Sequence, residues 1–173
     1  GFVLFNFYGE KETITLRTMS KGDLYISREN DRIILDFPTD KFTSSEIPEL
    51  TFNALGENPI EAYWGLNDLM LVFEKEEQIK NINPNFELLA TLKSRGVCIT
   101  APGNKVDFVS RFFAPQAGIN EDPVTGSAHT TLIPYWANRL GKTNMIARQL
   151  SKRGGTIYCE LSGERVKIGG KAI

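Results

Sequence analysis

The residues of this chain that could do chemistry lie close together, in the block from Arg111 to Thr130. Within it Asp122 precedes a proline, and a proline pushes the residue before it towards extended backbone and away from a helix. The Asp122 carboxylate is therefore expected at a bend, where it could exchange a proton with a ligand or accept a hydrogen bond from a ligand amine or hydroxyl. The alternative interpretation is that Asp122 or Thr125 only caps the helix that follows.

A turn formed by Gly126 and Ser127 comes next and opens an apolar segment. The first backbone N–H groups of a helix lack partners inside the helix, and the helix dipole adds about half a positive charge there. Glycine also lets a ligand approach the main chain closely. We therefore expect Gly126 and Ser127 to bind the carboxylate of a small molecule, and Ser127 could at the same time be an ordinary N-cap.

Arg111 and His129 are further candidates for this site, each with a structural alternative. Arg111 lies on an expected strand, so it either reaches out to solvent or pairs with a carboxylate such as Asp122. The neighbouring Glu121 is expected to point the other way, towards solvent. His129 is the only histidine, and we expect it to pack or form a hydrogen bond at the helix start. It lies two residues after Ser127, and such residues do not face each other on a helix, so the two cannot act as base and nucleophile.

The patterns around this block predict the elements that position it. A strand is expected over residues 108–113, before the block. A helix is expected from about Ser127 to Leu140, where Gly141 provides a C-terminal signal. Its side chains are apolar around most of the circumference, which is typical of a helix buried inside a curled sheet. Pro134 removes one backbone N–H within this helix, so we expect a kink.

Alternating apolar residues predict further strands on both sides of this helix. One three-strand meander is expected before Pro38, and a second meander follows the helix. Another helix is expected from an N-cap at Asn83, with Pro84 at its first position, to Gly96. Residues 39–48 show little periodicity, so a boundary between two parts is expected near Thr43. Including the strands of both meanders, and besides residues 108–113, the expected strands cover residues 14–16, 24–26, 33–37, 60–64, 69–73, 97–100, 145–150, 156–161 and 165–168.

The composition excludes several classes of function. The 173 residues are 41% hydrophobic and carry 20 basic against 21 acidic side chains, a net charge of −1, which argues against a nucleic-acid or anionic-membrane partner. No apolar run reaches the roughly 18 residues of a membrane span.

Cys98 and Cys159 lie in separate apolar runs, so we expect small buried residues, unpaired thiols and a reducing, cytoplasmic compartment. One histidine and two distant cysteines cannot build a zinc site of the usual spacing, so no metal is expected.

Five blocks of this chain stand in a characteristic order and spacing: residues 107–115, 118–129, 134–137, 140–142 and 151–155. In these blocks the chain resembles the PhzF-like (phenazine biosynthesis) isomerase family. This resemblance implies an α+β fold of the diaminopimelate-epimerase type, in which each of two similar lobes is a mixed or antiparallel sheet wrapped around a central helix. It also implies a proton-transfer site between the lobes that needs no cofactor, with Asp122 in the active cleft.

The resemblance further implies that part of the site is missing from this chain. Members of the family begin with a lobe that carries a catalytic glutamate, and no glutamate here matches that motif. The opening run Gly1–Phe7 resembles a helix end, so residues 1–43 are expected to be the remnant of an N-terminal lobe, a helix end plus a β-meander. Residues 44–173 would then form the C-terminal lobe, with its central helix at about 127–140.

The expected function is therefore a cofactor-independent isomerase or epimerase that moves a proton on a small carboxylic acid. This chain would hold an incomplete half-site and be inactive alone. The alternative is a non-catalytic binding or interaction protein that reuses the fold, because a fold does not by itself determine a function. A homodimer is a further expectation.

Overall fold

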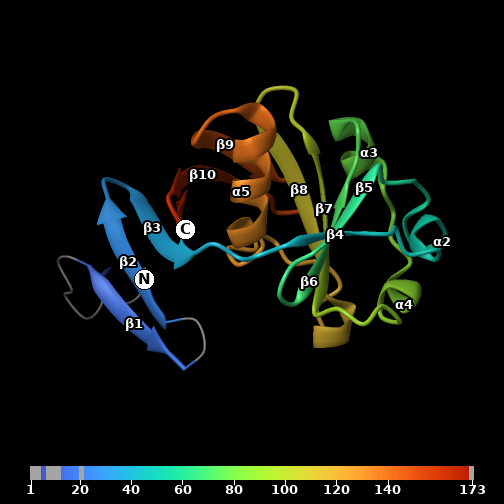
Figure 1. Cartoon of the computed structure of the whole chain (residues 1–173), viewed down its shortest axis with the longest axis horizontal. Helices are drawn as coiled ribbons and strands as arrows, with labels where there is room; N and C mark the ends of the chain where they lie inside the picture. The colour runs from blue at the N-terminus through green and yellow to red at the C-terminus, as the bar shows by residue number, and fades with distance from the viewer. Residues whose placement is uncertain (1–4, 7–12, 20–21, 172–173) are drawn as a thin grey trace.

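The computed structural model describes residues 5–6, 13–19 and 22–171 (Figure 1). Within these ranges, eleven strands form one sheet in the spatial order β1-β2-β3-β11-β10-β9-β8-β7-β6-β5-β4. The strands are β1 (Ile14–Thr18), β2 (Gly22–Glu29), β3 (Arg32–Pro38), β4 (Thr43–Ser45), β5 (Glu61–Trp64), β6 (Asp68–Val72), β7 (Gly96–Pro102), β8 (Phe108–Phe113), β9 (Asn144–Gln149), β10 (Gly155–Ser162) and β11 (Arg165–Gly170). The helices are α2 (Thr51–Leu55), α3 (Glu76–Asn81), α4 (Phe86–Leu89), the 3₁₀ turn η1 (Pro115–Ala117) and α5 (His129–Leu140).

Helices connect the strands that run parallel. The β6–β7 and β8–β9 pairs are parallel, and the other neighbouring pairs are antiparallel. Two parallel neighbours cannot be joined by a tight hairpin and need a crossover, usually through a helix. Here α3 and α4 cross from β6 to β7, and α5 crosses from β8 to β9. The sheet is therefore mixed, as expected for this α+β fold.

Helix α5 is the centre of the larger hydrophobic core, which confirms the expected buried helix. Trp136 is fully buried, stacks on Phe108 at 5.6 Å between ring centroids, and donates a hydrogen bond from Nε1 to Thr100 Oγ1 at 3.0 Å. Side chains from β6 to β11 share this cluster, and residues of β3 and β5 pack at its border. Because strands from so much of the sheet contact one helix, the sheet must curl around α5, which lies against β8, β9 and β10 in Figure 1.

A second core covers the opposite face of strands β5 to β8. In β6, Leu69 and Leu71 belong to this second cluster whereas Met70 belongs to the first. Both faces of β6 are therefore covered, and its side chains from Leu69 to Val72 are almost completely buried. The short helices α2, α3 and α4 supply the second cluster with apolar side chains such as Leu55, Ile79 and Leu89. Neither α2 nor α3 was expected from the sequence.

The proline in α5 is compensated by the segment between the two expected parts. Helix α5 continues through Pro134, which has no N–H to offer to the carbonyl of Thr130. That carbonyl instead accepts a hydrogen bond from the backbone N–H of Asp40 at 3.0 Å. An otherwise unpaired backbone oxygen is thereby satisfied, and the chain after β3 is held against the first turns of the helix.

The N-terminal meander is confirmed where the structure describes it. Strands β1 to β3 pair antiparallel, Asn30 forms the β2–β3 turn with a positive φ of 56°, and β3 ends at Pro38. Strand β3 also pairs with β11, so the meander and the rest of the chain share one sheet, with the meander extending to one side in Figure 1. The helix end expected at residues 1–7 lies outside the described residues except for Phe5 and Asn6, which are helical. The boundary near Thr43 stays a prediction.

Two expected helix starts are wrong by about two residues. The N-cap of α4 is Asn85 rather than Asn83, because the Asn85 side chain accepts the Leu88 N–H at 3.1 Å, and α4 ends at Leu89 instead of reaching Gly96. Helix α5 begins at His129 rather than Ser127, since the preceding residues form a tighter turn. Its end at Leu140 is confirmed, with Gly141 in the left-handed conformation.

Both cysteines are buried free thiols, as expected for small residues in apolar strands. Burial raises the pKa of the Cys159 thiol to about 12 and also raises the pKa of Cys98, so neither is a ready nucleophile at neutral pH. Among the described helices, none is both long and apolar enough to cross a membrane. The cytoplasmic location stays a prediction.

Candidate active site

The loop that carries Asp122 is held in place by β8 and by Gln149, the last residue of β9. The Asp122 N–H donates to the carbonyl of Phe112 at 3.0 Å, at the end of β8. Gln149, which is 1% exposed, donates from Nε2 to the Asp122 carbonyl and accepts the Thr125 N–H at Oε1, both at 2.8 Å. Since a buried amide with both ends bonded has little freedom to rotate, Gln149 fixes the loop from residue 122 to 125.

One oxygen of the Asp122 carboxylate is held and the other is open. Thr125 Oγ1 donates to Asp122 Oδ2 at 2.5 Å, whereas Oδ1 has no partner among the described residues. Helix α5 has Ala128 as its N-cap and no side-chain cap hydrogen bond. The interpretation that Asp122 or Thr125 caps the helix is therefore wrong. Asp122 is half-buried, with one oxygen available to a ligand.

Gly126 and Ser127 form the turn that leads into α5. Their carbonyls accept the N–H groups of His129 and Thr130 at 3.0 and 3.2 Å, but their own N–H groups have no partner in the described part of the chain. Gly126 is half-buried and Ser127 is exposed. A methyl group at Gly126 would lie 3.4 Å from Leu35 Cδ1, so strand β3 passes close to this turn. Carboxylate binding by these two residues stays a prediction.

Sequence reasoning missed Arg95, which contacts the same turn. Arg95 Nη2 donates to Ser127 Oγ at 3.1 Å. The guanidinium also forms a two-point ion pair with Asp68, with Nε 2.9 Å from Oδ1 and Nη2 bonded to Oδ2. The hydrogen bond to Asp68 raises the pKa of Arg95. Arg95 lies 32 residues before Ser127, so only the arrangement of β6 and β7 reveals the contact.

Arg111 pairs with a carboxylate, but with a different one from that expected. Its Nε and Nη2 atoms lie 2.7 and 3.1 Å from the two oxygens of Glu121, so the pairing with Asp122 and the solvent-facing Glu121 are both wrong. Arg111 Nη1 also donates to the carbonyls of Ile79 and Ile82 at 3.1 and 2.7 Å. A cation at the C-terminal end of a helix is favoured by the helix dipole. Arg111 therefore anchors α3 to β8 and does not reach the turn at Gly126.

His129 packs and forms a hydrogen bond at the helix start, as expected. It is completely buried, its ring centroid lies 6.1 Å from that of Phe108, and its Nδ1 lies 2.8 Å from the Thr125 carbonyl. Burial lowers the pKa of His129 to about 4, so the ring is neutral at pH 7. Because a carbonyl can only accept, Nδ1 carries the proton. Nε2 is buried with no partner among the described residues.

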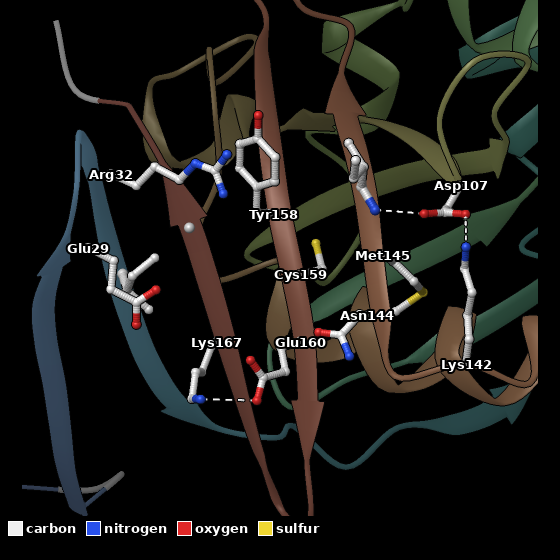
Figure 2. A pocket seen from close by; sticks show the side chains of 13 residues that line it. Glu29, Arg32, Asp107, Lys142, Asn144, Met145, Tyr158, Cys159, Glu160 and Lys167 are labelled. Atoms are coloured by element: carbon white, nitrogen blue, oxygen red, sulfur yellow. Dashed lines mark hydrogen bonds and ion pairs between the residues drawn. The ribbon is translucent and has the colours of Figure 1, made fainter.

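A hollow lies elsewhere, on the face of the sheet that points away from α5 (Figure 2). Its volume is about 460 Å³, and Tyr158 is among its lining residues, with the Arg32 guanidinium carbon 3.4 Å from the ring centroid. Lys167 pairs with Glu160 at 3.0 Å, and Lys142 pairs with Asp107. These charges satisfy one another, and no residue of the turn that leads into α5 lines the hollow. We therefore place the candidate site at the start of α5.

Within residues 5–6, 13–19 and 22–171, no three side chains of His, Cys, Asp or Glu cluster in a way that could hold a metal ion. The groups at the start of α5 are suited to a different task. They combine a carboxylate oxygen, two backbone N–H groups and a hydroxyl at one helix terminus. Such a set can bind an anion and exchange a proton close to it.

The chain is similar to known proteins over most of its length. The family model described as phenazine biosynthesis-like protein (PhzC-PhzF) matches residues 25–173. Two uncharacterized isomerases of Pseudomonas aeruginosa are 44% and 45% identical over 99% and 87% of the chain. The chain spans only 66% and 58% of the length of these two relatives. A crystal structure of a phenazine biosynthesis protein of the PhzF family from Enterococcus faecalis is 45% identical, with a TM-score of 0.91. The match covers 98% of this chain and 65% of the Enterococcus chain.

Proposed function

The chain belongs to the PhzF-like family of phenazine biosynthesis-like proteins, and on that premise we propose that it carries the carboxylate-binding half of a cofactor-independent isomerase site. The fold is the epimerase-like one that the family implies. The observation that carries the proposal is the open Oδ1 of Asp122 beside the unpaired N–H groups of Gly126 and Ser127. The proposed reaction moves a proton on a small carboxylic acid.

The parts of this half-site divide the work. The N–H groups at the start of α5 hold the substrate carboxylate, where the helix dipole and the free donors favour negative charge. Asp122 addresses the reacting region of the substrate, either by exchanging a proton or by accepting a hydrogen bond from an amine or hydroxyl. Thr125 and Gln149 hold the aspartate in place, so its open oxygen meets the substrate without reorganisation.

A second proton-transferring group is expected from residues outside this chain, since the chain spans 66% of the length of a relative that is named an isomerase. In the proposal that group is the glutamate of the other lobe, and the substrate lies between the two lobes. The 173-residue chain is then expected to bind carboxylates but not to turn them over.

The test uses a longer protein that contains both lobes. A panel of small carbon acids with one carboxylate is incubated in D₂O, and incorporation of solvent deuterium is followed by NMR. We expect Asp122→Asn to abolish exchange while carboxylate binding persists, and Gly126→Val to weaken binding itself. Unchanged exchange in Asp122→Asn would remove its assigned role. Carboxylate binding without any exchange in the unaltered protein would favour the non-catalytic binding protein instead.

A further inference from the structure

The hydroxyl of Ser127 has one hydrogen-bond partner in the described part of the chain, and this partner decides where its proton points. Arg95 Nη2 lies 3.1 Å from Ser127 Oγ. A guanidinium has five N–H donors and no acceptor, and it keeps its charge at any pH that the fold survives. Ser127 Oγ must therefore be the acceptor in this contact. Its own O–H is left to donate in another direction, and Ser127 is exposed to solvent.

Arg95 is held firmly enough to impose this geometry. Asp68 binds it with both carboxylate oxygens, which fixes the plane of the guanidinium. The guanidinium carbon also lies 5.8 Å from the ring centroid of Phe112 on β8. The backbone N–H of Arg95 donates to the Asn67 carbonyl at 2.7 Å. The Asp68 pair and the Phe112 ring orient the guanidinium, and the backbone bond fixes the main chain from which it extends.

The fold brings these groups together at the beginning of two parallel strands. Asp68 is the first residue of β6, Gly96 is the first residue of β7, and the two are register partners. Arg95 therefore stands beside Asp68 where β7 begins. Glycine is required at position 96, because a Cβ atom there would lie 2.3 Å from Cζ of the Phe112 ring. The Phe112 ring thus fills the space beside Gly96, the residue that follows Arg95.

We propose that Arg95 is a positioning residue for the site at the start of α5: by occupying the acceptor side of the Ser127 hydroxyl, it directs the Ser127 O–H to an anion bound at the Gly126 and Ser127 N–H groups. The inference rests on the proposed function and adds a third donor to the two backbone donors. Arg95 acts through the hydroxyl rather than through its charge, because the two-point pair with Asp68 balances that charge. Asp68 in turn fixes Arg95.

The test is a double-mutant cycle on Arg95→Gln and Ser127→Ala in this 173-residue chain. Sodium benzoate is titrated into ¹⁵N-labelled protein, and the amide shifts of Gly126 and Ser127 report the affinity. A hydrogen bond of ordinary strength corresponds to roughly 2- to 10-fold in affinity, so we expect each single variant to weaken benzoate binding by about that factor. In the Ser127→Ala background, Arg95→Gln should have almost no further effect, since the hydroxyl through which it acts is gone.

A matched control separates this coupling from a general loss of positive charge. Arg17→Gln removes another arginine that pairs with an aspartate, Asp23 at 3.1 Å, on strands β1 and β2. This variant should leave benzoate affinity unchanged. Arg95→Lys keeps the positive charge, but its N–H donors all lie on one nitrogen and cannot bind Asp68 and Ser127 as a planar fork, so it should restore only part of the affinity. Thermal melting of each variant shows whether the fold is retained.

A second measurement needs no ligand. Three-bond couplings give the χ1 distribution of Ser127, which should be dominated by one rotamer in the unaltered chain and averaged in Arg95→Gln. A folded Arg95→Gln variant that keeps the single rotamer overturns the inference, and so do additive effects in the cycle. If benzoate fails to shift the Gly126 amide even in the unaltered chain, the proposed anion site is wrong, and the rotamer measurement still decides whether Arg95 positions Ser127.

Discussion

The two ends of helix α5 each carry a polar cluster with an arginine and a carboxylate, but only one cluster is complete. At the C-terminal end, Glu61 accepts hydrogen bonds from Tyr63 and Tyr135 at 2.8 and 2.9 Å and pairs with Arg139 at 2.5 Å. Gly141 closes the helix with its N–H on the Ala137 carbonyl. At the N-terminal end, two backbone N–H groups and one carboxylate oxygen have no partner among the described residues.

This difference between the two ends shows which polar groups have a structural role and which are available to a ligand. Burial alone would raise the pKa of the Glu61 carboxyl, but the hydrogen bonds from Arg139, Tyr63 and Tyr135 outweigh it and hold that pKa below its ordinary value. The cluster at Glu61 therefore joins β5 to α5 and has little capacity left for binding. Donors without partners at the other end gain most from a ligand, because unpaired polar groups are costly once water is excluded.

The largest expected difference between the two ends of α5 is the effect of a substitution on turnover. In a protein with both lobes, Asp122→Asn should lower turnover by roughly 10²- to 10⁴-fold, the range typical of a lost general acid or base. Glu61→Gln should leave turnover within about twofold, although it alters a carboxylate at the other end of the same helix. Steady-state kinetics on both variants checks this, and equal losses in the two would break the distinction between the ends.

The next effect is a pH dependence of stability that originates at the N-terminal end. His129 has a pKa of about 4 in the fold, because burial disfavours its charged form, against 6.5 as the reference value. The unfolded chain therefore binds a proton first as the pH falls, so His129 contributes stability above pH 6.5 that is lost between pH 6.5 and 4. The loss amounts to about 3 kcal/mol, at 1.36 kcal/mol for each unit of pKa.

Urea unfolding at steps from pH 7 to 4.5 measures this loss. His129→Gln should be less stable at pH 7 but should show a flat profile between pH 6.5 and 5, since no other histidine is present. The same slope in both proteins would show that His129 is not the group responsible.

A smaller loss is expected when the C-terminal cluster is broken. Glu61→Ala leaves the hydroxyls of Tyr63 and Tyr135 without their acceptor and Arg139 without its ion pair. Because Glu61 and Arg139 are partly exposed, water compensates in part, and we expect a loss of about 1–3 kcal/mol in the free energy of unfolding. Benzoate affinity at the Gly126 amide should not change. A weakened affinity would mean that the two ends are coupled through the helix.

The smallest effect concerns the backbone at Gly126. A methyl group there meets Leu35 Cδ1 at 3.4 Å, an ordinary contact, so Gly126→Ala should change the unfolding free energy by less than about 1 kcal/mol. Gly126→Val should also fold but should lower benzoate affinity roughly tenfold, about 1.4 kcal/mol, because its branched side chain crowds the anion. Calorimetric melting and the amide titration test both variants. A valine variant with full affinity would remove the close-approach role of the glycine.

Local patterns predicted most of the framework. Apolar alternation located the strands of both meanders within a few residues, and the all-round apolar character of the segment from about Ser127 to Leu140 predicted a buried helix. Helices α2 and α3 were not predicted. Each is only five or six residues long, too short to be stable alone, so its formation depends on the sheet against which it packs.

The candidate site, too, was predicted only in part from the sequence. The block from Asp122 to Ser127 could be recognised from its residue types, because a proline, a Gly-Ser turn and a following helix act on their neighbours in the chain. The hydrogen-bond and ion-pair partners of these side chains could not be predicted. Arg111 binds Glu121 instead of Asp122, and Arg95 reaches Ser127.

The sequence by itself therefore determined the kinds of element and the chemical groups at the start of α5. The tertiary structure decided which groups meet. Thr130 shows this most simply: Pro134 in the sequence dictates that its carbonyl loses a helical partner, but only the path of the chain after β3 places the Asp40 N–H 3.0 Å away. Local conformation depends on residues a few positions apart, whereas hydrogen-bond partners depend on which strands become neighbours, and that is settled by burial of the whole core.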